Sequence, residues 1–237
     1  MMTNPLTIRA VELIHSLCDA AGVTRQRLLP KFSLNPQLLF SDPAADPNDE
    51  WRAYANATDP RAEHWVGMQS LLSILLEREA VDFASAEPAS QNWANAMSAA
   101  AVDLNSGSRD RTKLRRATLN HVIQDLGHEL PVAAAISGMS PEHFADWIRY
   151  DAEAAIQELP ALGRYRELIH RRLVDPGRRW HGNDLVDLVF LTAAAGYADF
   201  VVCERRTGED LRRAAESVSP GASVHPNLAD LVDDLGL

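Results

Sequence analysis

The chain has 237 residues, 46% of them hydrophobic, which is enough for one large domain or for one domain with a small appendage. Its formal net charge of −10 at pH 7 argues against strong phosphate binding over the whole surface, because such binding draws on clustered lysines and arginines. No apolar run has the length of a membrane span, and the two cysteines lie far apart in a chain that begins without a secretory leader. We therefore expect a soluble, cytoplasmic protein with reduced thiols.

The first 50 residues are predicted to form a small helical region and a linker. Apolar residues recur at helical spacing from Leu6 to Ala21, and Gly22 suits the C-terminal cap of that helix. The run FSDPAADPND, from Phe40 to Asp49, is rich in Pro and Asp, which is typical of a linker. The sequence therefore predicts a domain boundary near residue 50, followed by a domain over residues 51–237.

The middle of the chain is predicted to be mainly helical, with one short strand. A helix from Trp65 to Glu79 is followed by the apolar run Ala80–Ala84, which favours a buried strand. Glu87 comes just after this strand. Further helices are expected from Ala89 to about Asn105 and, with many basic residues, from Lys113 to Leu130.

The last part of the chain predicts alternating helices and strands. The expected elements are a helix that begins at Ser140 and runs to Leu159, a mostly apolar helix that ends at Gly196, a short buried strand over Asp199–Glu204, a helix opened by Thr207 and Asp210, and a strand over Ala222–His225. The order helix, strand, helix, strand implies an α/β layer with parallel pairing. We therefore expect a helix-rich α/β fold with a short parallel sheet.

Two carboxylates stand at the start of the apolar helix. Asp184 and Asp187 are three residues apart, so both project from the same face of the first turn. Crowded carboxylates repel one another, and a hard divalent cation such as Mg²⁺ or Mn²⁺ relieves that repulsion by accepting oxygen ligands. The alternative is that acids at a helix start only complement the helix dipole, which is common in proteins. On spacing alone, both interpretations stay open.

The stretch RWHGNDLVDLVFLTAAAGYADFVVCERR resembles the end of PIN-like nuclease domains, and the resemblance covers roughly residues 160–230. In that family an acid opens a helix, and a small residue, commonly Thr, ends the next strand sixteen residues later. Asp187 and Cys203 have this spacing, with Cys in the place of Thr. The resemblance implies a PIN-like three-layer arrangement around the short parallel sheet, preceded by the helical N-terminal region.

The resemblance also implies a metal site and a reaction. Asp184 would assist Asp187, and Glu204 falls one residue before the last acid of the family, a position held here by Arg205. Glu87 matches a glutamate that follows the family's second strand, whereas no early segment supplies the acid of the first strand. With Asp184, Asp187 and Glu204 as ligands of Mg²⁺ or Mn²⁺ and Glu87 as a further catalytic carboxylate, the resemblance implies hydrolysis of RNA phosphodiesters by a metal-activated water.

Two segments are locally basic. The segment RDRTKLRR, Arg109–Arg116, carries five basic residues against one acid, and Arg164–Arg179 holds six arginines against two acids. Such segments are either solvated helix faces or the sides of a groove for RNA. Trp180 is likewise either a core aromatic or a residue that stacks on RNA bases. The residues expected to bind RNA are Arg111, Lys113, Arg115, Arg171, Arg172, Arg178 and Arg179.

Two observations also support a second interpretation: the net charge is negative, and no early segment supplies the acid that ends the first strand in PIN-like domains. In this interpretation, the protein is a non-catalytic PIN-like scaffold that binds another protein or acts as a regulator. Independently of function, a homodimer is also expected. A nuclease should gather at least three of the carboxylates Glu87, Asp184, Asp187 and Glu204 in an open pocket. In a binding module, these carboxylates should point to separate surfaces.

Overall fold

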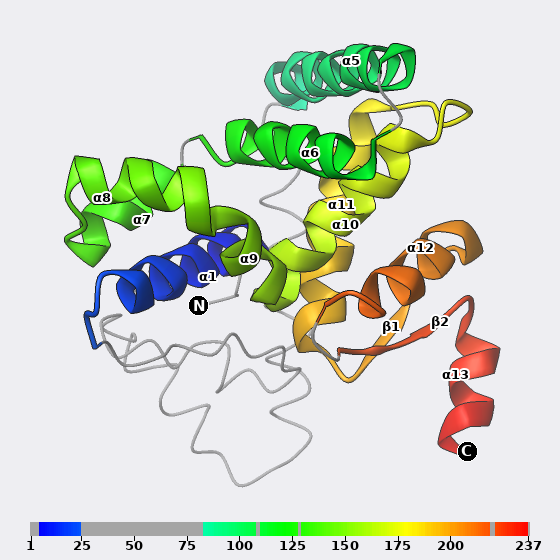
Figure 1. Ribbon diagram of the computed structural model, residues 1–237. Helices are drawn as coiled ribbons and strands as arrows, with labels where there is room; N and C mark the ends of the chain where they lie inside the picture. The colour runs from blue at the N-terminus through cyan, green and yellow to red at the C-terminus, as the bar shows by residue number, and fades with distance from the viewer. Residues whose placement is uncertain (1–4, 25–82, 108–109, 128, 219–220, 237) are drawn as a thin grey trace, which may run out of the picture. The chain divides into compact units, whose positions relative to one another are not determined.

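The computed structural model describes residues 5–24, 83–107, 110–127, 129–218 and 221–236 (Figure 1). The chain divides into two compact units, and the second comprises Pro5–Pro30 and Ser90–Leu237. The linker expected at Phe40–Asp49, the boundary near residue 50 and the helix expected from Trp65 to Glu79 all lie outside the described residues.

The described part of the chain is rich in helices and contains one short parallel sheet. Its helices are α1 (Pro5–Ala20), α5 (Phe83–Ser106), α6 (Arg111–Asp125), α7 (Glu129–Ser137), α8 (Pro141–Asp146), the π-helix η1 (Trp147–Asp151), α9 (Ala152–Glu158), α10 (Pro160–Val174), α11 (Gly182–Tyr197), α12 (Arg205–Ala215) and α13 (Leu228–Leu235). The strands are β1 (Phe200–Val202) and β2 (Ser223–His225), which pair in parallel. These elements agree with the expected helix-rich α/β class. Among the described helices, none is long and apolar enough to cross a lipid bilayer.

Helix α1 packs in the same unit as the C-terminal elements. It matches the helix predicted from Leu6 to Ala21, and Gly22 follows with a φ of 68°, which a glycine adopts without strain. Leu13 and Leu17 are fully buried, and the helix contacts α7, α10 and α11. The helical N-terminal region therefore contributes to the core of this unit.

The elements between residues 83 and 159 correct two predictions. Phe83 and Ala84 are the first residues of α5, so the strand expected over Ala80–Ala84 is wrong at its end, and Glu87 lies in a helix rather than after a strand. The single basic helix expected from Lys113 to Leu130 is divided into α6 and α7. The helix start at Ser140 is confirmed, because its Oγ accepts a hydrogen bond from the His143 backbone N–H at 3.2 Å.

Helix α10 lies at the centre of the unit and contacts α1, α6, α9, α11 and α12 (Figure 1). Its residues 161–169 are all buried, and these include the charged residues Arg164, Arg166 and Glu167. Buried charges are costly unless they have partners of opposite charge or hydrogen bonds. The charged groups of α10 therefore determine which side chains of the neighbouring helices must face it.

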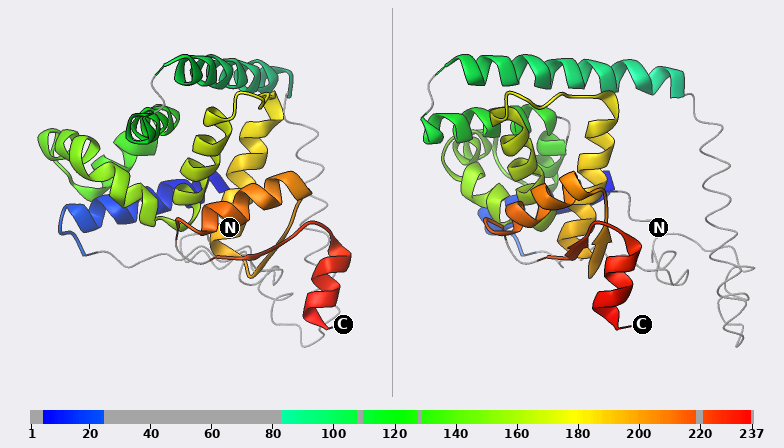
Figure 2. Two further views of the ribbon diagram at one scale, coloured as in Figure 1. Left: turned by 45° about the vertical axis from the view of Figure 1, so that its right-hand side comes forward. Right: turned by 90° about the vertical axis from the view of Figure 1, so that its right-hand side faces the viewer.

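The C-terminal elements follow the predicted order, and α12 and α13 both contact the two-stranded sheet (Figure 2). The strand expected to be buried over Asp199–Glu204 is shorter and only half-buried: Val201 is buried, whereas Phe200 and Val202 are exposed. Successive side chains of a strand point to opposite faces, so β1 has one covered and one open face. Helix α12 begins two residues before Thr207, and Glu204 is its N-cap.

Candidate functional site

Asp184 lies in the first turn of α11, and both of its carboxylate oxygens have partners inside the protein. Oδ2 accepts a hydrogen bond of 2.7 Å from the backbone N–H of His181, and Oδ1 lies 2.9 Å from Nη1 of Arg172. The first contact caps the helix, and the second is an ion pair with α10. A metal ion at Asp184 would therefore compete with a buried guanidinium for this carboxylate.

Asp187 lies on the same helix and is exposed. Although the residue is exposed, neighbouring atoms desolvate its carboxyl group and raise its pKa. The negative charges of Asp184 and Glu204 raise this pKa further, and the positive charge of Arg172 lowers it. The three acids thus lie close enough to interact electrostatically, where α11 meets the C-terminal end of β1.

Glu204 follows β1 and stands at the N-cap position of α12, where its side chain forms no capping hydrogen bond to the backbone. Its Oε1 accepts a hydrogen bond from the Thr207 hydroxyl at 2.7 Å, and the residue is exposed. Within the described ranges, no three His, Cys, Asp or Glu side chains form a group with metal-binding geometry. Glu87 belongs to α5, and its side chain lies outside the described part. The structure therefore brings Asp184, Asp187 and Glu204 into one neighbourhood without arranging them as metal ligands.

Arg172 and Trp180 belong to the interior. Arg172 is 4% exposed, and its guanidinium carbon lies 5.8 Å from the centroid of the Trp180 ring. Trp180 is also buried and contacts Trp93 edge to face, with 5.5 Å between the ring centroids. Of the two interpretations of Trp180, the structure supports the core aromatic. The charge of Arg172, which was expected to face RNA, is used for the ion pair with Asp184.

The other six residues expected to bind RNA fall into two groups. The first group has partners inside the protein: Arg115 pairs with Glu167, Arg171 donates a hydrogen bond of 3.0 Å to the carbonyl of Arg213, and Arg178 lies 3.4 Å from Asp210. The second group consists of Arg111, Lys113 and Arg179, which are exposed and have no ion pair with any described residue. These three side chains are free to meet a ligand.

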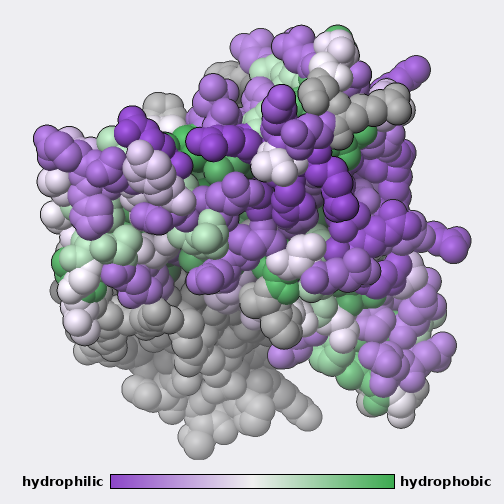
Figure 3. Space-filling view, viewed as in Figure 1, coloured by the Kyte–Doolittle hydropathy of each residue, from purple (hydrophilic) through white to green (hydrophobic). Residues whose placement is uncertain are grey.

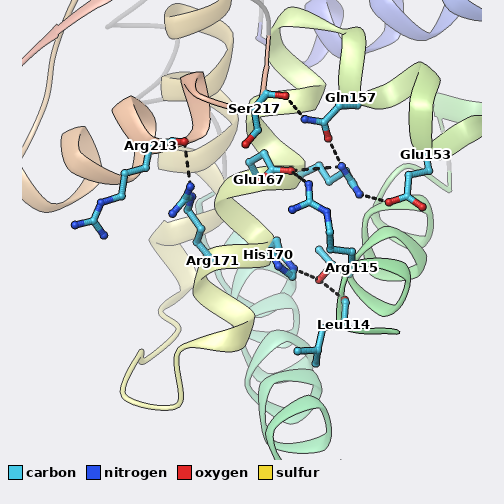
Figure 4. A network of polar contacts seen from close by, with 11 residues as sticks. Leu114, Arg115, Glu153, Gln157, Glu167, His170, Arg171, Arg213 and Ser217 are labelled. Atoms are coloured by element: carbon cyan, nitrogen blue, oxygen red, sulfur yellow. Dashed lines mark hydrogen bonds and ion pairs between the residues drawn. The ribbon is translucent and has the colours of Figure 1, made fainter. Parts of the chain in front are cut away.

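A network of ion pairs connects α6, α9 and α10 (Figure 4). Glu167 contacts both Arg115 and Arg166, and Arg166 also reaches Glu153 on α9 at 2.6 Å. Sequence reasoning missed this network, because Arg166 and Glu167 stand in a segment that was interpreted as a solvated or RNA-facing basic helix. Their burial depends on partners more than ten residues away, and no local pattern indicates such partners.

Basic residues stand on α6, α10 and α12, and α10 contacts both of the other helices. Helices α6 and α12 both pack against α10, and hydrophilic residues gather over α6 and α12 (Figure 3). We use the name cationic face for the following basic side chains of these three helices: Arg111, Lys113, Arg115, Arg171, Arg212 and Arg213. Clustered cations attract polyanions such as nucleic acids.

In comparisons with known proteins, no family model, no curated protein and no solved structure matches the chain.

Proposed function

We propose that the protein binds RNA through the cationic face and acts as a non-catalytic module. The observation that carries this proposal is that Arg111 and Lys113 are exposed and without ion pairs among the described residues, on a helix that packs against the arginine-rich α10. Guanidinium and ammonium groups bind phosphates by releasing condensed counterions. The net charge of −10 restricts such binding to the places where cations cluster.

The PIN-like three-layer arrangement and the cytoplasmic location are part of the same proposal. The order of α11, β1, α12 and β2 supports the three-layer arrangement. The free thiols of Cys18 and Cys203 are consistent with a cytoplasmic location. A homodimer, also expected from the sequence, stays a prediction. Light scattering on the full chain would test it, and a monomeric mass at every concentration would rule it out.

Replacing Arg111 and Lys113 together by alanine should weaken the binding of a single-stranded RNA and flatten its salt dependence. Each lost phosphate contact reduces the slope of log K against log salt by about 0.7 for single strands, so the double variant should lose about 1.4. Fluorescence anisotropy with a labelled RNA, repeated at several salt concentrations, measures both effects. Arg149→Ala is the matched control, because Arg149 is 62% exposed on η1, outside the cationic face. An equal loss in the control and the double variant would contradict the proposal.

The second candidate function is metal-dependent hydrolysis of RNA by Asp187, Asp184 and Glu204. It is favoured by the mutual electrostatic influence of these three acids beside β1. These three residues do not fit a metal ion in their present arrangement, because both carboxylate oxygens of Asp184 already contact other groups. One pairs with the Arg172 guanidinium, and the other accepts a hydrogen bond from the His181 backbone N–H. Of the three acids, Asp187 has no hydrogen bond or ion pair with any described residue, so Mg²⁺ or Mn²⁺ would meet the least competition there.

Hydrolysis is tested by incubating the protein with mixed RNA and Mn²⁺ and comparing Asp187→Asn. If the second candidate holds, the wild type cleaves and the variant loses about 100-fold or more of the rate, because the amide is a weaker metal ligand than the carboxylate. We expect no cleavage by either protein. Cleavage by the wild type alone would replace the non-catalytic proposal with the hydrolytic one, and equal cleavage by both would indicate a contaminating nuclease.

A further inference from the structure

A pocket of about 600 Å³ lies between the C-terminal half of α5 and the segment 176–181, which joins α10 to α11. Its volume lies within the range of about 300 to 1,000 Å³ that is typical of sites for small organic ligands. Ala101, Val102 and Pro176 give it apolar walls, and Asn105, Arg178 and Arg179 supply polar groups. None of the described residues that line it is acidic.

Hydrogen bonds fix the walls of the pocket. The side-chain amide of Asn105 donates to the carbonyls of Ala101 at 2.7 Å and Leu173 at 2.9 Å, so it ties α5 to the end of α10. On the other side, the Asp175 carboxylate accepts a hydrogen bond of 3.0 Å from the Gly177 N–H, which forms the turn that leads to the arginines. A pocket with fixed walls loses little conformational entropy when a ligand binds.

The charge of the pocket is positive and only partly compensated. Arg178 lies 3.4 Å from Asp210, which holds it in place. Arg179 is exposed and forms no ion pair with any residue that the structure describes. A guanidinium group binds phosphate oxygens through two parallel hydrogen bonds. The pocket therefore combines an apolar slot with an uncompensated phosphate-binding group.

We propose that this pocket takes one nucleotide of a single-stranded RNA, with its base in the slot and its phosphate on Arg179. The inference rests on the proposed RNA binding and names the form of RNA that is bound. Val102 and Pro176 would cover the flat base, and Oδ1 of Asn105 would accept a hydrogen bond from the N–H groups at the edge of the base. A base in a duplex is paired and stacked, so it cannot enter the slot.

The test compares two pocket variants with a control. Arg179→Ala removes the phosphate-binding group, and Val102→Trp fills the slot from an exposed position, since Val102 is 67% exposed. Val132→Trp is the control, because Val132 is 58% exposed on α7, away from the pocket lining. Binding of AMP and UMP is measured by calorimetry, and binding of one RNA sequence as single strand and as duplex is measured by anisotropy.

We expect both pocket variants to weaken mononucleotide binding by about tenfold or more and to remove the preference for single-stranded over duplex RNA. The Val132→Trp control should bind like the wild type. If RNA binding depends on Arg111 and Lys113 but not on Arg179 or Val102, the cationic face stands and the nucleotide pocket is overturned. If AMP binds and no RNA does, the proposed function fails, and the single-strand inference fails with it. A wild type that binds neither AMP nor UMP at millimolar concentration also overturns the inference.

Discussion

Replacing Glu12 by alanine should lower the free energy of unfolding by about 3 to 5 kcal/mol. Glu12 is 2% exposed, and its carboxylate accepts hydrogen bonds from the backbone N–H groups of Ala161 at 2.7 Å and Leu162 at 2.8 Å. The Tyr197 hydroxyl donates to the same carboxylate at 2.7 Å. Alanine would leave two buried backbone N–H groups and the half-buried Tyr197 hydroxyl without this acceptor, and it would uncap the start of α10. Urea denaturation followed by circular dichroism measures the loss.

Glu158→Ala is the control for this substitution, because Glu158 is an exposed glutamate at the end of α9. It should change the free energy of unfolding by less than about 0.5 kcal/mol. If the Glu12 variant were no less stable than this control, α1 would not be attached to α10 as described.

The Glu12→Gln variant should also change the pH dependence of stability. Burial raises the pKa of Glu12 above its ordinary value of 4.5, and the hydrogen bonds from Ala161, Tyr197 and Leu162 offset part of this rise. An acid with a raised pKa in the folded state binds its proton more tightly there, so stability falls as the pH rises from the unfolded to the folded pKa. The wild type should therefore lose stability relative to Glu12→Gln as the pH rises from 4.5 to the raised pKa. Parallel stability curves over this range would show that the pKa is not raised.

Replacing Glu167 by alanine should have an effect of similar size, about 3 to 5 kcal/mol. The Glu167 side chain is 3% exposed and neutralises both Arg115 and the equally buried Arg166. Without it, Arg166 keeps the hydrogen bond to Gln157 and one carboxylate, that of Glu153, whose side chain is 49% exposed, so a buried positive charge is left poorly compensated. Thermal or urea unfolding measures the effect.

Glu153→Ala provides the comparison, because it removes the exposed carboxylate from the same guanidinium. It should cost less than Glu167→Ala, because the half-exposed Glu153 carboxylate is partly hydrated and Arg166 keeps the buried Glu167 as its counter-charge. The two variants also differ at His170, whose pKa is lowered by burial and by Arg115 but raised by Glu167. Loss of Glu167 should therefore lower the His170 pKa further in an NMR titration. Equal destabilisation by the two variants would contradict the central role given to Glu167.

Local sequence patterns predicted the elements whose ends are determined locally. The α1 helix with Gly22 and the helix start at Ser140 depend on residues within one or two turns, and both were predicted. The run Ala80–Ala84 was assigned to a strand, although Phe83 begins α5, because a short apolar run suits a strand or a helix equally well. The break between α6 and α7 was missed for a related reason, since Gly127 is tolerated within helical patterns.

The candidate site was predicted less well, because its chemistry depends on contacts between distant residues. The spacing of Asp184 and Asp187 placed both on α11, but it did not indicate that Arg172 from α10 pairs with Asp184. In the same way, Glu12 shows no pattern that distinguishes it from a solvated acid, and its partner N–H groups lie about 150 residues away. The partners of a buried charge are set by packing between helices, and single-sequence periodicity does not report on that packing.

The most direct test of the account is the affinity of the wild-type protein for a labelled single-stranded RNA, measured across a range of salt concentrations with EDTA present. The account predicts binding at low salt and a linear fall of log K with log salt, with a slope at least as steep as about −2, because Arg111, Lys113 and Arg179 contribute about 0.7 each and further residues of the cationic face add to them. The RNA should remain intact throughout. Failure to bind at low salt, or an affinity that does not change with salt, would contradict the claim that exposed cations of this protein bind the RNA backbone.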